Sequence, residues 1–108
     1  MKKFDTEYKL LNEMYQDGYF PDFLVDKVKS LIQDIISFLE TGERNLEKIQ
    51  NKFDKMTEAI NKLQEEFEEN DSELDTGARE IFCETIEYII KWFDIDIAVE
   101  DATSRREW

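Results

Sequence analysis

The chain contains no histidine and only one cysteine, Cys83. Without histidine it cannot assemble a Ser-His-Asp or Cys-His catalytic system, a histidine general base or a histidine-ligated metal site. It also lacks the side chain that normally titrates near neutral pH. A single cysteine cannot form an internal disulfide or supply the ligands of a thiolate zinc site. These absences exclude the commonest kinds of nucleophilic and zinc chemistry.

Glycine and proline are also scarce, with three glycines and one proline in 108 residues. A β-rich fold needs many turns, so this composition disfavours it. The three glycines are isolated from one another, which excludes a glycine-rich phosphate loop. No apolar run approaches the roughly 20 residues of a membrane span, and acidic residues interrupt the N-terminal stretch where a signal peptide is apolar. We therefore expect a cytoplasmic protein.

Hydrophobic residues make up 41% of the chain and aromatic residues 13%. A chain of this length and composition can bury a core without metal ions or disulfides. The composition thus argues against global disorder, although 38% of the residues are charged. We expect one α-helical domain over residues 1–108.

The charge is strongly acidic and unevenly distributed. The formal net charge is −13. Residues 65–108 contain 15 acidic and 4 basic side chains, net −11, whereas residues 1–40 carry −3 and residues 41–64 carry +1. Nucleic acid and anionic membranes are poor partners for such a surface, because both are bound by clustered lysine and arginine. A basic protein partner fits better, and plain solubility is the alternative explanation.

Hydrophobic periodicity predicts four main helices. The first covers about residues 5–16, and Gly18 follows it as a left-handed C-terminal cap. The second begins at Pro21 or Asp22 and ends at Glu40, with Gly42 closing it. Its apolar arc is broad, so we expect this helix to be largely buried.

The third helix shows the clearest pattern, an a/d heptad seam. Its members are Leu46, Ile49, Phe53, Met56, Ile60, Leu63 and Phe67. The seam predicts either antiparallel packing inside the chain or a coiled-coil homodimer. The fourth helix begins between Ser72 and Thr76, where Ser72 and Asp75 resemble a capping box, and continues to about Phe93.

The predicted fold is therefore all-α, an up-down bundle of four main helices whose second and fourth members form the central pair. Residues 94–108 are expected to form an irregular or helical tail. Ile95, Ile97 and Val99 alternate as in a strand, but a lone strand has no partner, so a turn followed by a short helix is favoured. Trp108 is large enough to dock back onto the bundle.

An aromatic stretch, MYQDGYFPDFLVDKV, covers residues 14–28. Tyr15, Tyr19, Phe20 and Phe23 surround the break between the first two helices. We expect these rings mainly to plug one end of the bundle, since aromatic side chains next to core stripes usually bury. Tyr15 and Tyr19 leave a binding patch open as the alternative, because a plug does not need their hydroxyls.

Carboxylates are the remaining groups that could bind a metal or catalyse a reaction. Glu65 with Glu68, and Glu84 with Glu87, are spaced to share a helix face and could hold Mg²⁺ in an all-helical hydrolase of phosphorylated small molecules. The second acidic pair that such enzymes need is interrupted by Lys91. A solvated acidic face is therefore the preferred interpretation.

The acidic loop also fails as a calcium site. Asp71, Glu73 and Asp75 occupy ligand positions, but Thr76 stands where a calcium loop has glycine and Phe82 where it has glutamate. We predict no catalytic residue, no metal and no cofactor. The predicted partner-binding residues are Glu65, Glu68, Glu69, Asp71, Glu73, Tyr15 and Tyr19.

The segment MYQDGYFPDFLVDKVKSLI and the closing SRREW resemble a family of small bacterial proteins classed only as a domain of unknown function. The resemblance covers most of the chain and implies a bacterial, intracellular, helical protein. It implies no activity and no site residues. Our functional hypothesis is a non-enzymatic interaction protein, immunity- or adaptor-like, that binds a basic partner through its acidic C-terminal surface. The magnesium hydrolase and a structural homodimer are the alternatives, so the chain could be a monomer or a homodimer.

Overall fold

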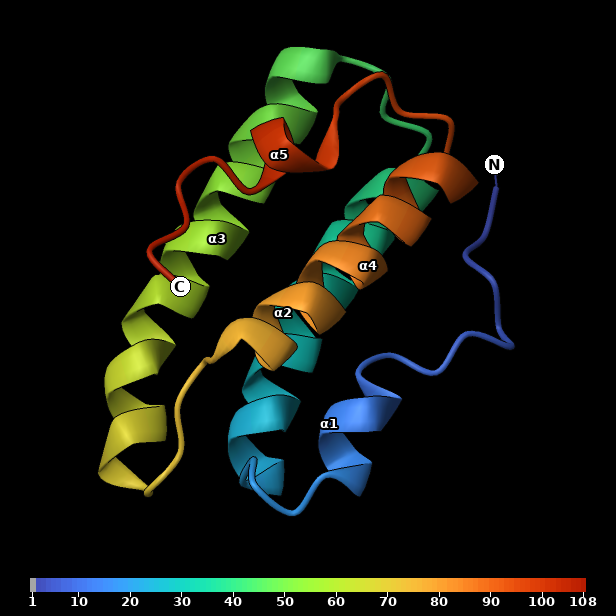
Figure 1. Cartoon of the computed structure of the whole chain (residues 1–108). Coiled ribbons are helices and arrows are strands. Elements are labelled where there is room, and N and C mark those ends of the chain that lie inside the picture. Colours follow the sequence, from blue (N-terminus) through green and yellow to red (C-terminus); the bar gives the residue numbers. More distant parts are fainter. Residues whose placement is uncertain (1) are drawn as a thin grey trace.

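In the computed structural model, which describes residues 2–108, the chain is all-helical (Figure 1). The helices are α1 (Asn12–Gln16), α2 (Asp22–Glu40), α3 (Leu46–Glu69), α4 (Thr76–Trp92) and α5 (Val99–Ala102). The all-α prediction is confirmed. The predicted set of four main helices is not, because only α2, α3 and α4 are long and α1 and α5 are short.

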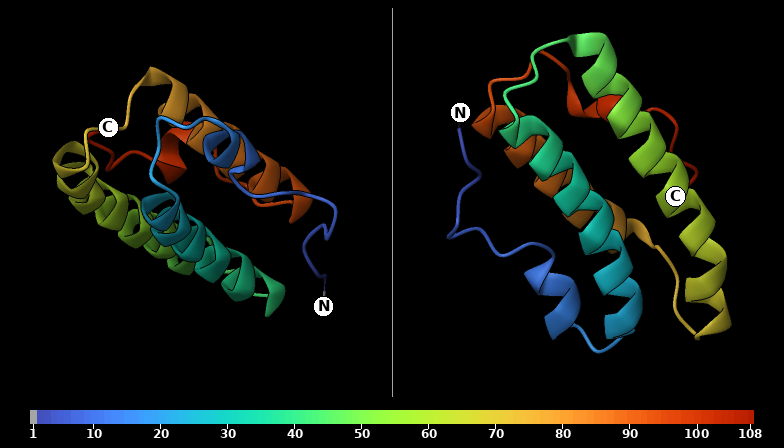
Figure 2. Two further views of the ribbon diagram at one scale, coloured as in Figure 1. Left: turned by 90° about the horizontal axis from the view of Figure 1, so that it is seen from below. Right: turned by 180° about the vertical axis from the view of Figure 1, so that it is seen from behind.

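The three long helices alternate in direction along the chain (Figures 1 and 2). The closest backbone packing joins α2 and α3, so the predicted central pair of the second and fourth helices is wrong. Helix α1 contacts α2 and α4, and α5 contacts α3 and α4. Each short helix thus packs against two of the long helices.

All three long helices contribute to one hydrophobic core. Its largest fully buried side chains include Phe53 and Phe67 from α3 and Phe82 from α4. The heptad seam lies in this core, apart from Leu46, which is 43% exposed, and Leu63, which is partly buried. The chain therefore packs the seam internally and does not leave it free for a coiled-coil partner.

The first predicted helix is much shorter than expected. Residues 5–11 are not helical, and Leu11 adopts a left-handed conformation with φ 57° immediately before α1. The ring of Tyr8 stacks on Tyr88 of α4 with centroids 4.3 Å apart. The Trp92 indole donates a hydrogen bond to the Lys3 carbonyl at 2.8 Å. These contacts hold the segment along one edge of the molecule, and tertiary packing overrides local helix propensity.

The Tyr88 hydroxyl ties this segment to α4 by donating a hydrogen bond to Asp5 Oδ2 at 2.6 Å. This bond, helped by the Glu7 amide, lowers the pKa of Asp5 below its usual 3.8. A carboxylate with a depressed folded-state pKa stabilises the fold above its unfolded pKa, and this stability is lost as pH falls through the folded value.

We therefore expect Tyr88→Phe to be less stable than the wild type at about pH 6, with the two unfolding free energies converging towards about pH 2. Urea unfolding across this range measures the difference. Tyr8→Phe is the matched control, because the Tyr8 hydroxyl makes no hydrogen bond within residues 2–108. A constant gap between Tyr88→Phe and wild type at all pH values would contradict the assigned bond.

The two glycines that were predicted to cap helices differ in the structure. Gly42 has φ 88° and its N–H bonds to the Leu39 carbonyl at 3.0 Å, so it closes α2 as predicted. Gly18 does not have a positive φ, and α1 ends at Gln16, so the prediction that Gly18 forms a left-handed cap is wrong.

Asp75 caps the start of α4 by accepting the Ala78 N–H at 2.9 Å. Ser72 forms no capping box, since no hydrogen bond joins its buried Oγ to the Asp75 N–H within residues 2–108.

Alanine substitutions at these two glycines are expected to change stability in opposite directions. A Cβ at Gly18 would meet nothing within 4 Å. Gly18→Ala should therefore stabilise the fold by roughly 0.4–1 kcal/mol, because the unfolded chain loses freedom. Gly42→Ala should destabilise it by about 1–2 kcal/mol through the left-handed backbone. Thermal unfolding of both variants measures this, and equal shifts would contradict the two conformations.

Residues 94–108, the tail, form a turn and a short helix, as predicted. Arg44, between α2 and α3, donates to the carbonyls of Phe93 at 2.8 Å and Asp94 at 3.1 Å, which satisfies the end of α4. The chain then turns back through α5, and Trp108 docks on the bundle with 8% of its surface exposed.

Candidate functional site

Two connections meet at one end of the molecule, the α1–α2 connection and the α3–α4 connection (Figure 1). The ring of Phe20 packs edge-on against Phe67, near the end of α3, with centroids 6.4 Å apart. Lys27 on α2 forms an ion pair of 2.8 Å with Glu66 on α3. These contacts place the first turns of α2 beside the last turns of α3.

The aromatic stretch divides into a buried part and an exposed part. Phe20 is 5% exposed and plugs this end of the bundle, as expected. Tyr19 and Phe23 are 43% and 53% exposed. The Tyr19 ring packs edge-on against Phe20 at 5.1 Å, and its backbone N–H donates to Asp17 Oδ1 at 3.1 Å. Tyr19 and Phe23 are thus large aromatic side chains that are exposed to solvent, next in sequence to the buried Phe20 or close to it.

Tyr15 is placed differently from Tyr19. It is half-buried, and its hydroxyl donates a hydrogen bond to the Asp26 carboxylate. Burial, followed by this bond, raises the pKa of Tyr15 to about 12. The Lys29 ammonium lies 5.8 Å from the centre of its ring. Because its hydroxyl is engaged within the chain, Tyr15 does not join Tyr19 in one exposed pair.

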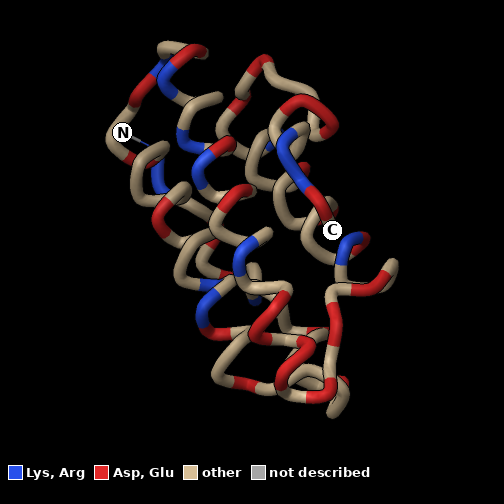
Figure 3. Tube along the Cα trace, turned by 90° about the vertical axis from the view of Figure 1, so that its left-hand side faces the viewer, with Lys and Arg blue, Asp and Glu red and all other residues tan. Residues whose placement is uncertain are grey.

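The predicted acidic residues lie on the last turns of α3 and in the α3–α4 connection. Figure 3 shows one end of the molecule where acidic residues have few basic residues among them. All five of them are exposed: Glu65, Glu68, Glu69, Asp71 and Glu73. None of their carboxylates forms a hydrogen bond or an ion pair with any side chain or backbone group of residues 2–108. Residues 65–75 include seven acidic and no basic side chains. This end therefore presents unpaired negative charge.

Tyr19 borders this charge. Partial burial raises the pKa of its hydroxyl, and the negative charges of Glu73 and Asp75 raise it further. Asp71 has φ 57°, and its N–H bonds to the Glu68 carbonyl at 3.2 Å as the chain leaves α3. This left-handed turn brings the α3–α4 connection back beside Tyr19. We call this surface the acidic end; it comprises Tyr19, Phe23, Glu65, Glu68, Glu69, Asp71, Glu73 and Asp75.

Phe23 is the residue of this surface that the sequence analysis did not select. On α2 its helical neighbours on the same face are Lys27, Ser30 and Asp34. These polar neighbours could have indicated from the sequence that Phe23 is exposed, because they place it outside the buried stripe that begins at Leu24. Asp75 was considered from the sequence as a helix cap and as one acid of a failed calcium loop, but not as a binding residue.

The glutamates of the hydrolase alternative are not brought together. Glu65 lies on α3, whereas Glu87 on α4 forms an ion pair with Lys91 at 2.8 Å. Glu84 borders a groove together with Glu7 and Glu13. Within residues 2–108 no group of three or more acidic or cysteine side chains is arranged to hold a metal ion. The two glutamate pairs, Glu65 with Glu68 and Glu84 with Glu87, therefore do not form one metal-binding group among the described residues.

The class defined by this fold and surface is a small all-helical protein with an acidic, aromatic end. Over residues 2–108, none of the helices has the length and apolar character that crossing a membrane requires. The chain belongs to a family of unknown function, DUF5713, whose model matches residues 4–108. This confirms the resemblance to a family without assigned function. No match was found among curated proteins or among solved structures.

Proposed function

We propose that this chain is a non-enzymatic protein-interaction module that binds a basic partner through the acidic end. The observation that supports it is the combination of five unpaired, exposed carboxylates with the exposed side chains of Tyr19 and Phe23. Neither feature alone defines an interface. Together they offer apolar contact area beside exposed charge that is mainly negative, since Lys27 is paired with Glu66. This is the arrangement of an interface core and its rim.

The two parts of the surface have different tasks in this proposal. Tyr19 and Phe23 are the anchors, since large aromatic side chains dominate binding energy when a partner buries them. The carboxylates attract and orient a positively charged surface, which raises the association rate and disfavours acidic competitors. Their exposure lets them do so without an unfavourable burial of charge in the free protein.

The uneven distribution of charge along the chain also supports the proposal. Residues 41–64, which include most of α3, carry a net charge of +1, whereas the carboxylates of the acidic end all lie in residues 65–75. Such separation orients the field of the molecule, and the net charge of −13 disfavours nucleic acid. We propose that the chain acts as one domain in the bacterial cytoplasm, with the character of an immunity or adaptor protein.

Affinity capture at two salt concentrations tests the proposal. The full chain, tethered through its N-terminus, is incubated with a lysate of its source cell at about 50 mM and about 500 mM salt. We expect a basic protein to be retained at low salt and released at high salt, because exposed charge pairs are screened. Retention of acidic proteins only, or of none, would contradict the proposal.

A further inference from the structure

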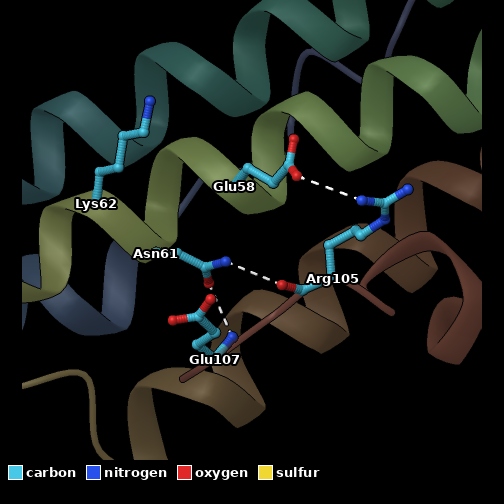
Figure 4. Close-up of a pocket in the computed structure, with 5 residues that line it drawn as sticks. All are labelled: Glu58, Asn61, Lys62, Arg105 and Glu107. Atoms are coloured by element: carbon cyan, nitrogen blue, oxygen red, sulfur yellow. Dashed lines mark hydrogen bonds and ion pairs between the residues drawn. The ribbon is translucent and has the colours of Figure 1, made fainter.

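The end of the chain lies along one face of α3, held by side chains that contact its backbone. Gln50 Nε2 donates to the Asp101 carbonyl at 2.9 Å. One turn after the buried Thr57, Asn61 contacts the chain beyond α5. A groove of about 560 Å³ lies there between α3 and the tail, bordered by Glu58, Asn61 and Lys62 of α3 and by Arg105 and Glu107 of the tail (Figure 4).

Asn61 binds the tail with both ends of its amide (Figure 4). Its Nδ2 donates to the Arg105 carbonyl at 2.9 Å, and its Oδ1 accepts the Glu107 N–H at 2.8 Å. The two contacted backbone groups are two residues apart, so one side chain recognises a short segment by its main chain. Main-chain recognition of this kind sets orientation and register while leaving side chains to provide specificity.

Two side chains of the tail provide that specificity. The Arg105 guanidinium lies 3.5 Å from Glu58 Oε2. Three residues later Trp108 is 8% exposed and packs edge-on against Phe82 with centroids 5.4 Å apart. The surface beneath the tail therefore accommodates a basic residue at one position and an aromatic residue three positions on.

The fit of Trp108 is incomplete. Its indole N–H is buried and has no hydrogen-bond partner within residues 2–108. A buried donor without a partner weakens the docked state relative to one in which the donor reaches water. The neighbouring ion pair is exposed, so it adds little to the affinity, although it still favours a basic residue at its position. The tail is thus held by contacts that a competing segment can replace.

We propose that the surface of α3 and α4 beneath residues 103–108 is a peptide-binding site, which these residues occupy and which accepts a partner segment with the same chemistry. That segment has a basic residue followed three positions later by an aromatic one. The tail supplies the template for this chemistry, and Glu58 supplies the complementary charge. The tail competes with such a segment at the millimolar effective concentration of a tethered ligand, so it restricts access to this surface.

A labelled peptide of residues 99–108, VEDATSRREW, tests the proposal by fluorescence anisotropy with the full chain. In the Trp108→Ala chain the tail no longer fills the aromatic position, so we expect the peptide to bind at least about tenfold more tightly than to wild type. Adding Asn61→Ala should abolish this gain. Adding Asn51→Ala, an exposed asparagine elsewhere on α3, should leave the gain unchanged.

Equal peptide affinity for wild type and Trp108→Ala would overturn the proposal, as would equal binding of a scrambled peptide. Hydrogen exchange in chains that keep Trp108 gives an independent test. The Glu107 amide should lose its protection in Asn61→Ala and keep it in Asn51→Ala. The Arg106 amide bonds to the Thr103 carbonyl at 3.0 Å and serves as the internal reference. Unchanged protection of Glu107 in Asn61→Ala would also overturn the proposal.

Discussion

Replacing Phe82 with alanine is expected to lower the free energy of unfolding by about 3–5 kcal/mol. Phe82 is fully buried on α4, and Trp108 packs against its ring. Truncation removes apolar contact from the core and also leaves the tail without its partner, so the cavity cannot close by a small shift. Urea unfolding followed by circular dichroism measures the loss.

Phe23→Ala is the matched control for this experiment. It removes the same side chain from a position that is 53% exposed, so stability should change by no more than about 0.5 kcal/mol. A loss below about 1 kcal/mol for Phe82→Ala, or a similar loss for both variants, would contradict the assignment of one ring to the core and the other to the surface.

The second large effect is expected on binding. Changing both Tyr19 and Phe23 to serine should weaken the affinity for the captured basic protein by at least about 30-fold, the equivalent of roughly 2 kcal/mol. Both side chains are already exposed, so the fold should remain stable. Calorimetric titration with the purified partner measures the affinity, and thermal unfolding checks the fold.

Leu46→Ser is the control for lost apolar surface. Leu46 is 43% exposed, like Tyr19, but stands at the first residue of α3, far along the helix from the acidic end. We expect this variant to bind as wild type does. If it binds as weakly as the double serine variant, the partner contacts another surface and the anchors have been assigned to the wrong end.

The long helices could be predicted from the sequence because their apolar residues repeat at helical spacing. The observed bounds of α2 are Asp22–Glu40, and Gly42 closes it as expected. The N-terminal segment could not be predicted in this way. Tyr8 has helical spacing to Leu11, yet its ring is held by Tyr88, far away in sequence. A local pattern contains no information about such a contact, and here the contact determines the backbone.

The candidate site shows the same limit. Its carboxylates could be found from composition, because residues 65–75 lack any basic side chain. The neighbours of these carboxylates depend on how the α1–α2 and α3–α4 connections pack together. The Lys27–Glu66 ion pair and the Phe20–Phe67 contact show this packing. Tyr15 and Tyr19 are close in sequence but have different surroundings, whereas Phe23 joins the surface from a helix that was expected to be buried.

The central claim is that the acidic end, and not the total negative charge, binds the partner. It is tested most directly by comparing two charge-reversal variants in calorimetric titration at low salt. Glu69→Lys with Glu73→Lys alters the acidic end. Asp96→Lys with Glu100→Lys makes the same change of net charge near α5, where both side chains are exposed. We predict that the first variant loses binding and the second keeps it. Equal loss in both variants, or a greater loss in the second, would contradict the proposed function.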